Sequence, residues 1–204
     1  MITLSDFAPD DTESGVGLAL QDERGRYLFF LAGTWHHSPE GELFYAGIGG
    51  HREEGESWLE CAHREAKEEV GTDVNILSAS TTWHIAYEGT LERVELDESP
   101  RPFALYEMIH PEGTPKAGKL YRIVIYKAQL CDRPRDLPKE ELRGVIALRR
   151  EQIIKSLERK PTLAELLSEG AKIVIGGKGV SHQVRFYPIG AARALAHVFR
   201  QISE

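Results

Sequence analysis

The chain has 204 residues, 41% of them hydrophobic and 28% charged, and this composition is typical of a folded globular protein rather than a disordered one. The formal net charge of −7 argues against a basic surface for polymeric nucleic acid, although a divalent metal ion still lets an acidic protein bind an anionic substrate. Two cysteines make no disulfide framework, and no stretch has the pattern of a signal peptide or of a membrane span, so we expect a cytoplasmic protein without membrane association.

The N-terminal part of the chain predicts three strands. Apolar residues 15–20 and 27–31 flank a polar spacer that contains glycine, which is typical of a hairpin. A third strand-like run, residues 42–46, leads into a glycine-rich segment that ends at Gly49 and Gly50.

The pattern then becomes helical from Ser57 to Val70, because apolar residues recur at spacings of three and four. Ser57 and Glu60 form a capping-box pattern at its start, and Gly71 is a typical C-terminal stop. The sequence therefore predicts a helix with one apolar face.

Further strand-like runs follow, separated by segments rich in Glu, Pro and Gly. They cover residues 74–87, 103–109, 120–129 and 145–148. A helix at about 151–158 precedes Arg159-Lys160-Pro161, and beyond it we expect a helix near 163–168, a strand-like run at 172–175 and a final helix at 189–201. The order lacks the regular strand–helix alternation of a doubly wound sheet. We expect an α/β protein with a domain at 1–158 and a mainly helical C-terminal extension, 159–204, packed on it.

Three glutamates on the predicted helix carry the chemical signal. Glu65, Glu68 and Glu69 stand at i, i+3 and i+4, so a helix gathers their carboxylates on one patch. Their mutual repulsion would be relieved by Mg²⁺, which prefers carboxylate oxygens and completes its coordination with water and substrate phosphates. The alternative is a solvated acidic face paired with Arg64 and Lys67.

The longer pattern around these acids favours the metal site. It has Gly50, Glu56 six positions on, Arg64-Glu65 after seven further residues, and then Glu68, Glu69 and Gly71. Segment Gly50–Thr72 therefore resembles the Nudix box, G-x5-E-x7-R-E-U-x-E-E-x-G-U with U an apolar residue, at every fixed position. The chain is identified on this pattern as a member of the Nudix hydrolase superfamily.

The resemblance implies a Nudix-type α/β/α sandwich with a mixed sheet. It also implies a Mg²⁺-dependent enzyme, with Mn²⁺ as a substitute, that cleaves a pyrophosphate bond in a nucleoside diphosphate linked to another moiety. The products would be a nucleoside monophosphate and the phosphorylated second moiety. The partner would be a small-molecule diphosphate, and a homodimer is one option because many relatives are dimers.

The resemblance also implies roles for individual residues. Glu65, Glu68 and Glu69 would form the metal cluster, with Glu65 and Glu69 as direct ligands, and Gly50 would offer its backbone carbonyl to the metal.

Three further positions of the box would orient the site. Glu56 and Arg64 would hold the loop against the helix through an ion pair. Gly49 would let the backbone approach the metal and phosphates closely, which a side chain would prevent.

The general base stays open between two sources. One candidate is Glu68, and the other is an acid from the loop after residue 129, among which we favour Glu141. The acids of that loop are Asp132, Asp136, Glu140 and Glu141. An equally good interpretation places Glu140 and Glu141 in the first turn of a short helix after Pro138.

The eight histidines show no zinc-binding spacing. We therefore interpret His36-His37, and His51 with His63, as loop or surface residues, and leave His110 and His182 as candidate substrate contacts.

Two competing functions use the same fold. One is a non-catalytic nucleotide-binding or regulatory module, in which the segment from Lys160 would act as the sensor. The other is an isomerase of an isoprenoid diphosphate, which needs a catalytic cysteine; Cys61 on the predicted helix and Cys131 after a strand both suit that role poorly.

Overall fold

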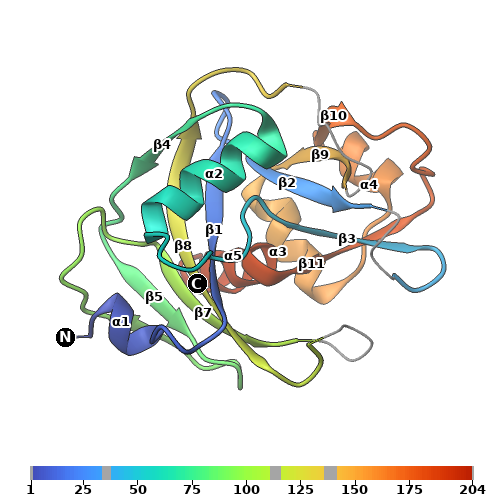
Figure 1. The fold of residues 1–204 in the computed structure, drawn as a ribbon. Coiled ribbons are helices and arrows are strands. Elements are labelled where there is room, and N and C mark those ends of the chain that lie inside the picture. The colour runs from blue at the N-terminus through green and yellow to red at the C-terminus, as the bar shows by residue number, and fades with distance from the viewer. Residues whose placement is uncertain (1, 34–37, 111–115, 136–141, 204) are drawn as a thin grey trace.

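In the computed structural model, which describes residues 2–33, 38–110, 116–135 and 142–203, the chain folds around one large mixed sheet (Figure 1). The strands are β1 (Ser14–Gln21), β2 (Tyr27–Ala32), β3 (Glu42–Gly47), β4 (Val74–Leu77), β5 (Thr82–Ile85), β6 (Leu91–Val94), β7 (Ala104–Ile109), β8 (Leu120–Leu130), β9 (Leu142–Leu148), β10 (Lys172–Gly176) and β11 (Arg185–Ile189). The helices are α1 (Leu4–Phe7), α2 (Trp58–Val70), α3 (Arg150–Glu158), α4 (Leu163–Ser168) and α5 (Gly190–Gln201).

The centre of the sheet is a long parallel pair. β1 runs beside β8 from the Ser14–Arg122 pair to the Gln21–Gln129 pair, and the path through the sheet reads β10-β9-β2-β1-β8-β7-β5-β6. β3 adds to β2, and β11 runs parallel to β3.

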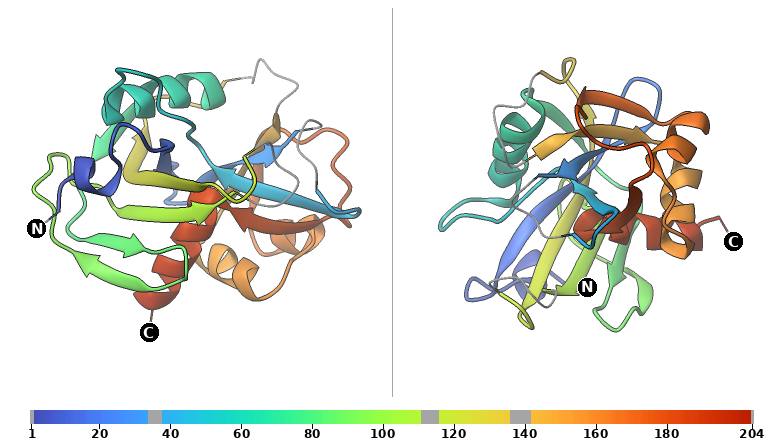
Figure 2. Two further views of the ribbon diagram at one scale, coloured as in Figure 1. Left: turned by 60° about the horizontal axis from the view of Figure 1, so that its bottom comes forward. Right: turned by 90° about the vertical axis from the view of Figure 1, so that its right-hand side faces the viewer.

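Helices cover both faces of this sheet, as the left view of Figure 2 shows with α2 above the strands and α5 below them. The side chains of β1 point alternately to the two faces of the sheet. Val16, Leu18 and Leu20 belong to the apolar cluster under α2, whereas Ala19 belongs to the cluster that includes α5. On the α5 side, a Cβ at Gly17 would lie 2.5 Å from the Cβ of Ala191, so only glycine permits this approach of the helix.

The helix predicted from the apolar spacing is confirmed as α2. Ser57 accepts a hydrogen bond from the backbone N–H of Glu60, and the Glu60 side chain accepts one from the backbone N–H of Ser57. Gly71 ends the helix in the left-handed region at φ 69°. The buried residues of its inner face are Cys61, Ala62, Glu65, Ala66 and Val70. One of them, Glu65, is a carboxylate.

Several elements differ from the sequence-based expectations. The single run expected at 74–87 is divided into β4 and β5, because Ala79 between them donates its backbone N–H to Arg101 instead of continuing a ladder. β6 carries no alternating apolar signal, since it is a largely exposed edge strand. The hairpin strands β1 and β2 pair only at Gln21–Tyr27, and β2 pairs mainly with β9. The sequence also gave no sign of α1 or β11.

The segment after residue 158 shares the sheet and the core with the rest of the chain. β10 pairs with β9, β11 pairs with β3, and α5 buries an apolar face that includes Leu195, Val198 and Phe199. The division into a domain at 1–158 and an extension stays a prediction.

None of the helices in the described residues is both long and apolar enough to cross a membrane.

Candidate active site

Glu65 is a buried carboxylate held against the glycine loop between β3 and α2. The residue is 8% exposed, and a Cβ added at Gly50 would lie 2.3 Å from Glu65 Oε1. Glycine at position 50 therefore makes room for this carboxylate. Burial raises the pKa of Glu65, because it disfavours the charged form more than the neighbouring Arg64 favours it. An additional cation beside Glu65 would favour the ionised form.

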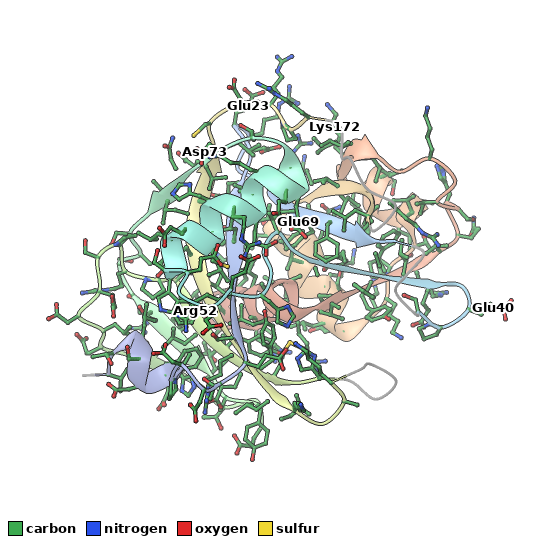
Figure 3. All side chains as sticks on the ribbon, viewed as in Figure 1. Glu23, Glu40, Arg52, Glu69, Asp73 and Lys172 are labelled. Carbon is green, nitrogen blue, oxygen red and sulfur yellow. The ribbon has the colours of Figure 1, made fainter. Side chains whose placement is uncertain are left out.

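Glu69, one helical turn on, contacts the preceding glycine of the same loop. Its Oε2 accepts a hydrogen bond of 2.8 Å from the backbone N–H of Gly49. Figure 3 shows the labelled Glu69 on α2 where the helix faces this loop. Gly49 has φ +139°, and a Cβ there would lie 2.1 Å from the carbonyl oxygen of Val16 on β1. Helix, loop and central strand thus meet at a point that admits no side chain.

Arg64 ties the loop to the helix through a fork of hydrogen bonds. Its Nε and Nη2 donate to Glu56 Oε1 and Oε2 at 2.8 Å and 2.9 Å, and Nη2 also donates to the carbonyl of His51 at 2.9 Å. Its Nη1 donates to Glu65 Oε1 at 2.7 Å. The hydrogen bonds from Arg64 lower the pKa of Glu56 to about 2, in spite of the burial of Glu56.

Glu68 is the most exposed of the three helix acids. Its side chain is 46% exposed, against 11% for Glu65, and its Oε2 lies 3.6 Å from Arg64 Nη1. Around Arg64 the carboxylates of Glu56, Glu65 and Glu68 thus share one guanidinium, and Glu69 stands on the next turn. An oxygen-rich group with excess negative charge is a donor set that fits a hard divalent cation such as Mg²⁺. Glu65, Glu68 and Glu69 could hold it.

The carbonyl of Gly50 already accepts one hydrogen bond, from the backbone N–H of Val16 at 2.9 Å. Its second lone pair faces only a weak donor, the Cys61 thiol at 3.9 Å, which the metal contact predicted from the sequence would replace.

The loop acid favoured as a base, Glu141, lies outside the described residues, as do Asp136 and Glu140. Of that set, Asp132 is described, and it lines a cleft with the turn between β1 and β2. Glu68 is therefore the candidate base whose surroundings are known.

The two cysteines do not offer an activated nucleophile at this site. The thiol of Cys61 is buried under the glycine loop, and burial, with the nearby carboxylates, raises its pKa to about 12. Cys131 is exposed and follows β8.

His36 and His37, interpreted from the sequence as loop or surface residues, lie outside the described residues.

A cleft of about 1020 Å³ opens beside the loop between β3 and α2. It is lined by the residues just before and at the start of β1, including Glu13, by the loop from His51 to Ser57, and by Lys116. Sequence reasoning missed Glu13 and Lys116, because they approach the loop only through the folded sheet.

The family model described as NUDIX domain matches residues 11–165 of the chain. No curated protein matches this chain. Among solved structures, a NUDIX hydrolase from Nitrosomonas europaea is 16% identical with a TM-score of 0.46, over 70% of this chain and 76% of that chain. The MutT protein from Methanosarcina mazei Go1 is 14% identical with a TM-score of 0.49, over 95% and 96%. An Ap4A hydrolase from C. elegans is 18% identical with a TM-score of 0.44, over 71% and 85%.

Proposed function

The chain belongs to the NUDIX domain family, and from this premise we propose that it cleaves a pyrophosphate bond in a nucleoside diphosphate linked to another moiety. The reaction would use Mg²⁺, or Mn²⁺ in its place, held by Glu65, Glu68 and Glu69. The substrate would be a small molecule, since the net charge of −7 disfavours polymeric nucleic acid.

One observation carries the proposal. Glu65 and Glu69, one turn apart on α2, both contact the double glycine of the loop: Glu65 against Gly50 and Glu69 at the N–H of Gly49. A merely solvated acidic face would leave these carboxylates in water. Here the fold holds them at Gly49 and Gly50, two loop positions without side chains, which leaves the space that a diphosphate needs to approach them.

The other residues of the site would have different roles, which follow from their surroundings. Arg64 would position the loop through Glu56 and would also orient Glu65, since it donates to both. A divalent ion, when bound, would supply the positive charge that offsets the diphosphate and would lower the pKa of the attacking water. Glu68 would accept the proton of that water, because its carboxylate is the most exposed of the three helix acids. Glu141 is a second candidate for that step.

The test is a panel of nucleotides incubated with the protein in Mg²⁺ or Mn²⁺, with products separated by chromatography. The panel should contain nucleoside diphosphate sugars, dinucleoside polyphosphates and oxidised nucleoside triphosphates. We expect turnover of at least one class, its loss in Glu69→Gln, and unchanged turnover in Glu158→Gln, an exposed glutamate at the end of α3. Both variants should keep the circular dichroism spectrum of the parent.

Two outcomes would count against the proposal. Turnover retained by Glu69→Gln would remove the helix acids from the chemistry. Binding of a nucleotide by the parent without turnover of any class would favour the regulatory module.

A further inference from the structure

Three side chains far apart in sequence converge outside the glutamate cluster of α2. Glu13 precedes β1, His51 follows the double glycine, and His110 follows β7. One ligand atom from each lies within 4.8 Å of the other two. The sequence shows no spacing that would connect them, since the sheet brings them together.

The distances between these atoms suit a small ion. Glu13 Oε1 lies 2.7 Å from His51 Nε2 and 3.3 Å from His110 Nε2. Ligand atoms of a tetrahedral zinc site are about 3.4 Å apart, as follows from zinc–ligand bonds of about 2.1 Å. The Glu13–His110 pair is therefore already near that separation, whereas the Glu13–His51 pair has to open by about 0.7 Å.

The imidazoles are held in place by their neighbours. Both pack against the buried ring of Tyr121, with ring centroids 4.7 Å away for His51 and 5.2 Å for His110. The backbone of His110 is fixed by hydrogen bonds with Lys119 and Gly118. The site is thus set by the fold rather than by free rotation of long side chains.

His110 Nε2 is a buried polar atom without a hydrogen-bond partner among the residues that the structure describes. Its contact of 3.3 Å with Glu13 Oε1 is close enough for an ion pair but lacks the alignment of a hydrogen bond. A buried polar atom left in this way is costly. Coordination of a cation by its lone pair would remove that cost.

The electrostatics of the cleft favour a cation. Its lining contains five carboxylates, those of Asp10, Glu13, Glu53, Glu54 and Glu56, against the cationic Arg52 and Lys116. A cation already occupies the space: Lys116 Nζ lies 2.5 Å from Glu13 Oε1 and 3.4 Å from His51 Nε2.

We propose that Glu13, His51 and His110 bind a transition-metal ion of the zinc class, at a site separate from the acids of α2. The ammonium of Lys116 would take the place of the ion when none is bound. Two imidazoles and one carboxylate are a zinc-type donor set, whereas Mg²⁺ prefers a set made of oxygens alone. The site opens to solvent through His51, whose side chain is 53% exposed.

The experiment measures Zn²⁺ binding by isothermal titration calorimetry on chelator-treated protein, with excess Mg²⁺ present to cover the α2 acids. We expect one equivalent of Zn²⁺ to bind, and to remain in Glu69→Gln. His110→Ala and Glu13→Gln each remove one ligand and should weaken Zn²⁺ binding at least about tenfold. Even changes to residues that hold the ligands in place lower metal affinity about 10–100-fold. The matched control His182→Ala, an exposed loop histidine, should bind as the parent does.

A second variant probes the competing ammonium. Lys116→Ala should tighten Zn²⁺ binding several-fold, because no cation has to leave Glu13. Thermal melts without metal should show that each variant is folded. Three results would overturn the proposal: no Zn²⁺ bound by the parent, equal affinity in His110→Ala and the parent, or loss of the Zn²⁺ equivalent in Glu69→Gln with Glu13→Gln unaffected. The last result would place the ion on α2, and none of the three bears on pyrophosphate hydrolysis.

Discussion

Replacing Arg64 by alanine should lower both stability and activity, because this side chain joins the loop to the helix. The change removes two hydrogen bonds to Glu56, one to Glu65 and one to the carbonyl of His51. The Arg64 side chain is 25% exposed, and those of Glu56 and Glu65 are 12% and 11% exposed. Truncation would leave two largely buried carboxylates without their cation.

The magnitude lies between two known cases. Exposed ion pairs contribute about 0.2–1 kcal/mol, whereas removal of one partner of a buried pair costs about 3–5 kcal/mol. For this partly buried fork we expect a loss of about 2–3 kcal/mol in the free energy of unfolding. In a chain of this size each kcal/mol shifts Tm by about 2–4 °C, so Tm should fall by roughly 4–12 °C.

The loss should depend on pH with a definite sign. The pKa of Glu56 is depressed in the folded state to about 2 from its ordinary value of 4.5. The stability from its pairing with Arg64 is therefore fully present above pH 4.5 and is lost as the pH falls toward 2. The difference in Tm between the parent and Arg64→Ala should be largest near neutral pH and should shrink over that interval.

The assay pairs thermal melts with turnover on the substrate found by the panel. The matched control is Arg26→Ala, which removes a similarly buried ion pair with Asp22 near the β1–β2 turn, where the side chains are 15% and 13% exposed. The control should lose stability and keep its turnover at a temperature where it is folded. An Arg64→Ala protein with an unchanged Tm, or with the turnover of the control, would refute the reasoning.

Three further changes test two glycine contacts and the role of Glu68. Gly50→Ala should abolish turnover measured by product chromatography, because the new Cβ would lie 2.3 Å from Glu65 Oε1 and displace that carboxylate; normal turnover would contradict this contact. Gly17→Ala should cost about 1–3 kcal/mol in a urea melt, since its Cβ would overlap that of Ala191 on α5, and an unchanged midpoint would argue against the close approach. Glu68→Gln should lower kcat more than it lowers Mn²⁺ affinity measured by calorimetry, because Glu65 and Glu69 would still bind the ion directly. A loss of affinity as large as the loss of kcat would mean that Glu68 serves only as a metal ligand and not as the base.

The grouping of the acids on α2 could be predicted from the sequence because it is local. Helical geometry alone fixes that residues 65, 68 and 69 share a patch, and the Ser57 cap and the Gly71 stop mark the ends of that helix. The family follows from the same short segment. None of this requires knowledge of which distant strands pair.

The contacts that define the site belong to the tertiary structure. Glu65 reaches Gly50 only because the loop folds back over the helix, and Val16 on β1 holds that loop from below. The β1–β8 pair joins residues more than a hundred positions apart, so no local pattern encodes it. The polar edge strand β6 likewise gave no periodic signal.

The same limit explains the cluster of Glu13, His51 and His110. Each is an unremarkable polar residue in its own segment, and only the sheet brings their ligand atoms within 4.8 Å. The sequence by itself thus determined which residue types are available and which helix carries the acids. The folded chain decided which carboxylates are buried and which histidines face one another, because burial and long-range contact depend on packing between segments that have no fixed spacing along the chain.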